Sequence, residues 1–274
     1  MEARFSFPMS SDEGIRLNKF LASCGVGSRR QCDEIIRQGR VELNGSPVME
    51  LATRVGPNDH IRVDGKRMHV REHRVIAIYK PRGLVCSRDD ELGRETIYSL
   101  MPDHLQDLHH VGRLDRESEG LLILTNNGDL SQALLHPSRE IEKEYLVSLN
   151  QAIEKPHLAK LTEGIYTPEG KLRAKEVERL SARRLKIVLD HGAKRQIRIM
   201  LKTLGYQVIR LLRVRIGDLW LGELECGQWA DLTEEEVNLL LAKPAAPSKG
   251  RPGKKSGRKP GRKTDGKPGQ KRRA

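Results

Sequence analysis

The sequence predicts an α+β protein, in which a small module of helices and hairpins precedes a domain built on a mixed, mainly antiparallel sheet. Two observations predict this class. Helical spacing dominates a short early segment, and later apolar runs typical of buried strands recur without regular helices between them. The 274 residues are 37% hydrophobic but only 4% aromatic, so the core should be aliphatic. We expect domains over residues 15–72 and 73–242 and a tail over 243–274.

The first module should open with two short helices and continue into hairpins. Leucine, phenylalanine and cysteine residues over 17–24 fall at helical spacing. Ser28 and Gln31 form a capping-box pattern that predicts the start of the second helix, and Gly39 suits its end. Asn44-Gly45 and Asp64-Gly65 follow short apolar runs and predict tight turns.

The polar side of these two helices is strongly basic. Its cations are Arg16, Lys19, Arg29, Arg30, Arg37 and Arg40. The only acidic residues among them are Asp33 and Glu34. A charged helical face is usually just solvated, so this pattern alone is weak evidence of a functional surface.

The segment RLNKFLASCGVGSRRQCDEIIRQGRVELNG, followed by a strand that ends in VDG, resembles the alpha-L RNA-binding module of the ribosomal protein S-four type. The resemblance implies that the two helices lie against structured RNA and contact phosphates through the six cations. Because such modules also occur in proteins that do not modify RNA, the resemblance implies a partner but no reaction.

The second domain should hold several buried strands and two helices. Apolar runs predict strands over 75–79, 121–125, 145–147 and 185–189, and periodicity predicts helices near 130–135 and 196–204. The domain should end near Leu241.

The segment GRLDRESEG places Asp115 in a loop just before an apolar strand. Arg113 and Arg116 flank this carboxylate and should keep it ionised. An acidic residue in a loop is ordinarily just a solvated surface residue, so the spacing alone does not establish a catalytic role.

The longer stretch GRLDRESEGLLILTNNGDL resembles the catalytic motif of the rRNA pseudouridine synthases of the RsuA/RluB/E/F type. Three further motifs resemble this family in the expected order: IYKPRGLVCS, KEYLV and RQIRIMLKTLGYQVIRLLRVRIGDLWLG. The resemblance covers about residues 15–235 and implies a pseudouridine synthase catalytic domain after the RNA-binding module.

By this resemblance Asp115 is the nucleophile, and Tyr145 stacks on a flipped uracil and is a candidate base for its C5 proton. Arg198 matches the basic residue that pairs with the aspartate. Arg113 should face the RNA where the flipped base leaves its stack. Lys80 should be structural or contact a phosphate. Without the motifs, Tyr145 would be an ordinary core residue and Arg198 a solvent-facing one.

The implied reaction breaks the C1′–N1 bond of a uridine and rejoins C1′ to C5. Nothing is added and nothing leaves, so the resemblance implies no cofactor and no metal. The expected partner is ribosomal RNA or a pre-ribosomal particle, and the chain should act as a monomer. The SREIEKEYLV stretch and the long basic tail favour 23S over 16S rRNA.

The last 32 residues carry most of the charge. Residues 243–274 hold thirteen Lys or Arg against Asp265 alone, which gives +12 of the formal net charge of +13. Such a segment should be disordered and should bind a polyanion through counterion release. A solvated solubility tail is the alternative.

Other classes are less consistent with the sequence. It shows no membrane span and no secretory signal, and its four cysteines form no CxxC pair, so we expect a reduced, cytoplasmic, metal-free protein. A non-catalytic RNA-binding assembly factor should have lost Asp115, Tyr145 or Arg198, yet all three are present. A nucleic-acid glycosidase would usually need a second acid, for which Glu117 or Glu119 could serve.

Overall fold

The computed structural model describes residues 14–242, which form two compact units. The first unit ends at Arg74 and also takes in Asn126–Gly128, whereas the second comprises Val75–Thr125 and resumes at Asp129. The basic segment over 243–274, which the sequence predicts to be disordered, lies outside the described residues. No helix within the described range is long and apolar enough to cross a membrane.

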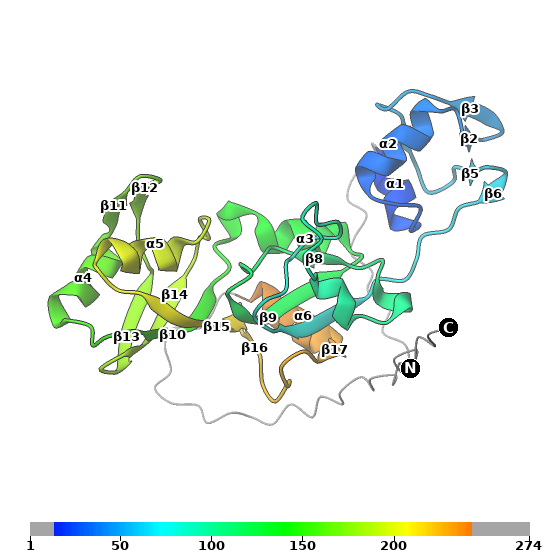
Figure 1. The fold of residues 1–274 in the computed structure, drawn as a ribbon. Coiled ribbons are helices and arrows are strands. Elements are labelled where there is room, and N and C mark those ends of the chain that lie inside the picture. Colours follow the sequence, from blue (N-terminus) through cyan, green and yellow to red (C-terminus); the bar gives the residue numbers. More distant parts are fainter. Residues whose placement is uncertain (1–13, 243–274) are drawn as a thin grey trace, which may run out of the picture. The chain divides into compact units, whose positions relative to one another are not determined.

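The first unit packs two short helices against small antiparallel strands (Figure 1). Its elements are β1 (Ile15–Arg16), α1 (Leu17–Ser23), α2 (Arg29–Arg37), β2 (Val41–Leu43), β3 (Ser46–Val48), β4 (Arg54–Val55), β5 (Ile61–Val63) and β6 (Lys66–Arg67). Four of the strands form a sheet in the order β3-β2-β5-β6, and β1 pairs with β4. Leu17, Leu21, Cys32 and Ile36 are fully buried between the helices and the sheet.

The turn and capping residues predicted in this unit are confirmed. The backbone N–H of Gln31 donates to Ser28 Oγ, and the backbone N–H of Ser28 donates to the Gln31 side chain, at 3.3 and 2.8 Å. Gly39 has a φ of 67°, as the end of α2 requires. Asn44-Gly45 and Asp64-Gly65 have positive φ at both positions and join β2 to β3 and β5 to β6.

The second unit contains one large sheet with helices packed on it. Its strands are β7 (Val75–Lys80), β8 (His109–Val111), β9 (Glu119–Thr125), β10 (Lys143–Leu149), β11 (Ile165–Thr167), β12 (Gly170–Leu172), β13 (Glu176–Ser181), β14 (Arg184–Leu189), β15 (Val208–Ile216), β16 (Leu219–Trp220) and β17 (Trp229–Asp231). Its α-helices are α3 (Gly128–Leu135), α4 (Lys155–Glu163), α5 (Gln196–Thr203) and α6 (Glu234–Leu241). The short strands β11 and β12 form a separate hairpin.

Nine strands make up the sheet, along the path β13-β14-β10-β15-β9-β7-β17, with β16 beside β15 and β8 beside β9. All pairs are antiparallel except β15 with β9, which confirms the predicted mixed, mainly antiparallel class. Gly120 lies in this parallel pair with a φ of +110°, and an added Cβ there would collide with the carbonyl oxygen of Arg213. Only glycine allows β9 and β15 to approach this closely.

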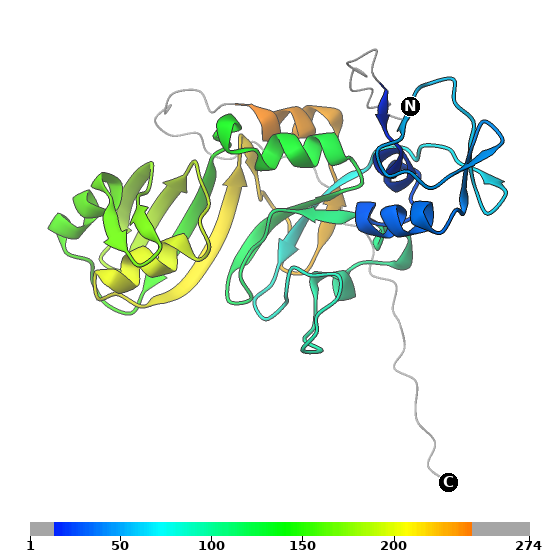
Figure 2. The same ribbon diagram turned by 90° about the horizontal axis from the view of Figure 1, so that it is seen from above.

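Two apolar clusters form part of the core of the second unit. The first includes Val147, Leu185 and Met200, and Figures 1 and 2 show α4 and α5 on this half of the sheet, with β10, β13 and β14. The second is built around β7 and β9 and includes Ile78 and Leu122. The boundary between the two clusters crosses the middle of the sheet, at β10 and β15.

Candidate active site

The loop between β8 and β9 carries Asp115, whose side chain is 28% exposed. Lys80, at the end of β7, contacts this loop from the interior of the protein. Its Nζ donates to the carbonyl oxygens of Pro81, Asp115 and Ser118, at 2.9, 3.2 and 2.8 Å. The Lys80 side chain is therefore part of the scaffold that positions the carboxylate.

Lys80 is completely buried, which favours the structural role expected for it over a contact with an RNA phosphate. Burial lowers the pKa of Lys80, and the nearby charge of Asp115 opposes that shift. Four carbonyl oxygens, the fourth that of Arg116 at 3.5 Å, surround the ammonium group in place of water. A buried lysine is tolerated when its donors are satisfied in this way.

The cation in direct contact with Asp115 is Arg195, with 3.6 Å between Arg195 Nη1 and Asp115 Oδ2. Arg195 immediately precedes α5 and has left-handed backbone angles, φ 56° and ψ 25°. Such a conformation is uncommon for a residue other than glycine and costs energy. It places the guanidinium of Arg195 beside the carboxylate of Asp115, so that opposite charges face each other. The family resemblance assigned this pairing to Arg198 rather than to Arg195.

Arg198 was expected to pair with Asp115, but its hydrogen bonds go elsewhere. Its Nη2 donates to the carbonyl oxygen of Glu117 at 3.0 Å, and its Nη1 donates to that of Val208 at 3.2 Å. Burial lowers the pKa of Arg198, whereas the charge of Asp115 acts in the opposite direction. Arg198 thus joins the aspartate loop to β15 and contributes its charge to the site from a second position.

Tyr145 lies on β10 at the boundary of the two apolar clusters and packs against both. The ring is half-buried. Across the sheet Tyr145 is opposite Arg213 on β15, and Arg213 is in turn opposite Gly120 on β9. Since β9 begins directly after the Asp115 loop, the topology brings the tyrosine and the loop to the same part of the sheet.

Two cations that the sequence did not mark out share this region. Arg213 is 5% exposed, and its Nε donates to the carbonyl oxygen of Leu121 at 2.7 Å. Burial lowers the pKa of Lys143, two residues before Tyr145, to about 8. The available signal was the KEYLV motif, since residues two apart on a strand share a face.

The acids near the loop are already paired. Glu117 Oε2 is 3.3 Å from Arg82 Nη2, and Glu119 Oε1 is 2.6 Å from Arg210 Nε. The Tyr79 hydroxyl also donates to Glu119, at 3.3 Å. Neither glutamate is the uncommitted acid that a glycosidase needs to protonate a leaving group.

Arg113, which was expected to face the RNA, is exposed on the same loop as Asp115. Its position two residues before the carboxylate leaves its guanidinium accessible to a bound nucleic acid.

The basic residues predicted on the first unit are exposed, except for Lys19, which is half-buried. Arg40 makes a two-point contact with Asp64, at 2.9 and 2.6 Å. Arg37 pairs with Glu34 at 3.3 Å, and Arg29 donates to Asn18 Oδ1 at 3.3 Å. Arg40 and Arg37 are therefore partly neutralised within the module.

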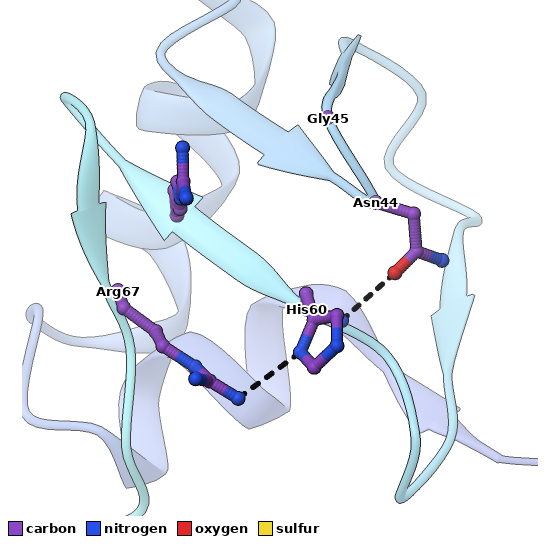
Figure 3. A pocket seen from close by; sticks show the side chains of 5 residues that line it. Asn44, Gly45, His60 and Arg67 are labelled. Atoms are coloured by element: carbon purple, nitrogen blue, oxygen red, sulfur yellow. Dashed lines mark hydrogen bonds between the residues drawn. The ribbon is translucent and has the colours of Figure 1, made fainter.

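The first unit also has a basic surface hollow that the sequence analysis did not single out. Asn44, Gly45, His60, Arg62 and Arg67 line it, from the sheet rather than from the helices (Figure 3). Arg67 Nη2 lies 3.1 Å from His60 Nδ1, and the backbone N–H of His60 donates to Asn44 Oδ1 at 2.9 Å. These contacts orient the side chains that line the hollow.

Comparisons with known proteins match both units. Residues 74–203 match the family described as RNA pseudouridylate synthase, and residues 15–61 match the S4 domain. The chain is 36% identical to the ribosomal large subunit pseudouridine synthase B of Bacillus subtilis, over 83% of this chain and 96% of that protein. It is 37% identical to the protein of the same name from Escherichia coli O157:H7, over 82% of each chain.

Among solved structures, the chain is similar to a crystal structure of pseudouridylate synthase. The TM-score is 0.61 with 33% sequence identity, covering 83% of this chain and all of that one.

Proposed function

The chain belongs to the RNA pseudouridine synthase family, with an S4 domain before its catalytic domain, and on that premise we propose that it isomerises a uridine of large-subunit ribosomal RNA with Asp115 as the nucleophile. The assignment of Asp115 as the nucleophile rests on the residues that surround its carboxylate. Its carboxylate is partly exposed, beside Arg195, on a loop that Lys80 fixes from inside the protein.

The proposed reaction needs only one carboxylate. Breaking the C1′–N1 bond develops positive charge at C1′, and Asp115 bonds to that carbon while the bonding electrons leave with the uracil. The uracil then rotates, C5 bonds to C1′ as the Asp115–C1′ bond breaks, C5 loses its proton and N1 gains one. Atoms and charge balance without a cofactor.

The surrounding residues prepare this attack. Arg195 pairs with the carboxylate, and Arg198 ties the loop to β15. We assign Tyr145 to stacking on the flipped uracil because its half-buried ring lies at the boundary of the two apolar clusters. Arg113 is exposed on the same loop and would occupy the gap that the flipped base leaves.

The S4 domain supplies binding, and the exposed Arg29 and Arg30 on α2 are candidates for phosphate contacts. We favour large-subunit rRNA because the relatives at 36 and 37% identity carry that substrate in their names.

The reaction and its site can be tested together. Ribosomal RNA from cells with and without the gene would be treated with carbodiimide, which marks pseudouridine, and read by primer extension. We expect one stop in 23S rRNA to disappear on deletion and to return when the gene is restored. Identical patterns in both strains would reject the proposed function, and a lost stop in 16S rRNA would reject the subunit.

The nucleophile is tested by Asp115→Asn, which keeps the size of the side chain but removes its charge. We expect isomerisation to fall at least about 1,000-fold, because a nucleophile rather than a binding contact is lost. RNA affinity should change by less than about twofold, since the phosphate contacts lie elsewhere. Glu117→Gln is the matched control on the same loop and should retain activity. Full activity of the Asp115 variant would contradict the assignment.

A further inference from the structure

Two cations on the same face of the sheet as Tyr145 lack the acidic partners found elsewhere in this domain. Arg215, also buried, contacts Glu144 of β10 and Glu142 just before that strand, each at 3.1 Å. Arg213 makes one hydrogen bond, to the carbonyl oxygen of Leu121, and its buried Nη2 has no partner among the described residues. Lys143 is likewise without an ion pair in the described part of the chain.

The strand register places these cations beside Tyr145. Lys143 is opposite Leu189 on β14, and Tyr145 is opposite Ile187. Directly paired residues of antiparallel strands point to the same side, and both β14 residues belong to the apolar cluster beneath α4 and α5. Arg213 is opposite Tyr145 on the other side of β10, on β15. The three side chains therefore share one face of the sheet.

The charged groups around Lys143 do not compensate its charge. Burial is the main cause of its lowered pKa, and Arg213 acts in the same direction. Asp190, just after β14, acts in the opposite direction but already contacts His191 at 3.0 Å. Desolvated cations without counterions cost stability, so two of them on one face of the sheet, both next to Tyr145, indicate a place for an anion.

We propose that Lys143 and Arg213 stabilise the uracil anion that exists between breaking of the C1′–N1 bond and formation of the C1′–C5 bond. This inference rests on the proposed function. When Asp115 bonds to C1′, the electron pair of the C1′–N1 bond stays on the uracil, and the negative charge spreads over N1, O2 and O4.

Both cations remain protonated during the proposed step, and the charge disappears when C5 bonds to C1′, C5 loses its proton and N1 gains one. Cations held in place in a site with little water stabilise such an intermediate more than mobile solvent does. They would also retain the detached base while it rotates.

The test is Lys143→Met, measured in single turnover on saturating RNA that contains the target uridine. We expect the rate to fall about 100-fold, the size of the effect when one charge-stabilising donor is removed, with RNA affinity unchanged. The same variant should be more stable than the wild type at neutral pH, because it loses a charge that is buried without a partner. Lower activity with higher stability excludes misfolding as the cause.

Lys143→Arg distinguishes the proposed role from that of a proton acceptor. The wild-type rate should decline as pH rises through about 8, where Lys143 loses its proton. Lys143→Arg should recover most of the activity and lack this decline, because arginine stays charged. Arg213→Lys, which keeps the charge but not the Nη2 group, should lose about tenfold. If Lys143→Arg is inactive, the proposal is overturned. The same holds if the rate rises through pH 8 in the wild type but not in Lys143→Arg.

Lys160→Met, on the exposed side of α4, is the matched control and should leave both rate and stability unchanged. Wild-type turnover at the target uridine is measured in the same experiment. If the wild type isomerises no uridine, the proposed function fails. If the wild type is active and Lys143→Met has the same rate and pH profile, only this inference fails.

Discussion

At the scale of single residues, Arg195 combines a strained backbone with a direct contact to the proposed nucleophile. Its left-handed conformation costs about 1–3 kcal/mol at a residue other than glycine. That conformation puts its guanidinium 3.6 Å from Asp115 and lets α5 begin at the next residue. Strain held at a charged contact is typical of functional sites, where activity opposes stability.

Arg195→Gly should therefore stabilise the fold and weaken the enzyme. We expect the free energy of unfolding to rise by about 1 kcal/mol, because glycine adopts this conformation without strain. The isomerisation rate should fall about 10- to 100-fold, since Asp115 loses its direct partner. Denaturant unfolding and single-turnover kinetics measure the two effects.

Glu140→Gly is the matched control, because Glu140 has a similar φ of 50° and is exposed. It should gain similar stability without loss of rate. An Arg195→Gly variant of normal rate would show that Arg198 alone provides the positive charge that the nucleophile needs.

Local motifs mark single residues in the sequence, but the direction in which a side chain points is visible only in the structure. Asp115 and Tyr145 stand out because their motifs are long and ordered. Arg195 and Arg198 lie in one short stretch, and which of them reaches the carboxylate depends on where α5 begins. For Lys80 the sequence leaves a structural role and a phosphate contact open, because lysine is seldom fully buried and four carbonyl oxygens at one point cannot be predicted from spacing.

At the scale of elements, turns and caps were predictable and the central sheet was only partly so. Ser28, Asn44-Gly45 and Asp64-Gly65 act through neighbours in sequence, so their patterns determine local structure. The nine-residue strand β15 was not expected, because its arginines interrupt the apolar run. Their partners, such as Glu142 and Glu144 for Arg215, are distant in sequence.

The predicted RNA-binding face of the S4 domain can be tested through α2. Arg29→Ala with Arg30→Ala should weaken RNA binding and reduce the salt slope of log Kd by about 1.4–1.8, if each arginine contacts one phosphate. The rate on saturating RNA should not change, because the chemistry belongs to the other unit. Filter binding at several salt concentrations measures the slope.

Arg62→Ala with Arg67→Ala, in the hollow on the sheet, removes the same charge from another surface of the module. We expect a smaller loss of affinity from this pair. A larger loss would move the RNA-binding face from the helices to the sheet.

At the scale of the whole molecule, most of the net positive charge and the proposed catalytic residues lie in different parts of the chain. The last 32 residues carry +12 of the net charge, whereas the preceding 242 carry only +1. The body therefore has little general attraction for RNA, and its cations act at particular points such as the Asp115 loop. Sequence composition alone shows this division, because it needs no knowledge of side-chain direction.

Deleting residues 243–274 should reduce affinity without stopping the reaction. The thirteen cations of the segment raise association with any RNA through counterion release, so their loss should weaken Kd at low salt and flatten its salt dependence. At saturating RNA the truncated and full-length enzymes should isomerise the target uridine at the same rate, because Asp115, Tyr145, Lys143 and Arg213 are all retained. A truncated enzyme that binds RNA fully but is chemically inactive would place part of the catalytic apparatus in this segment. A truncated enzyme with unchanged affinity and salt slope would instead support a role in solubility alone.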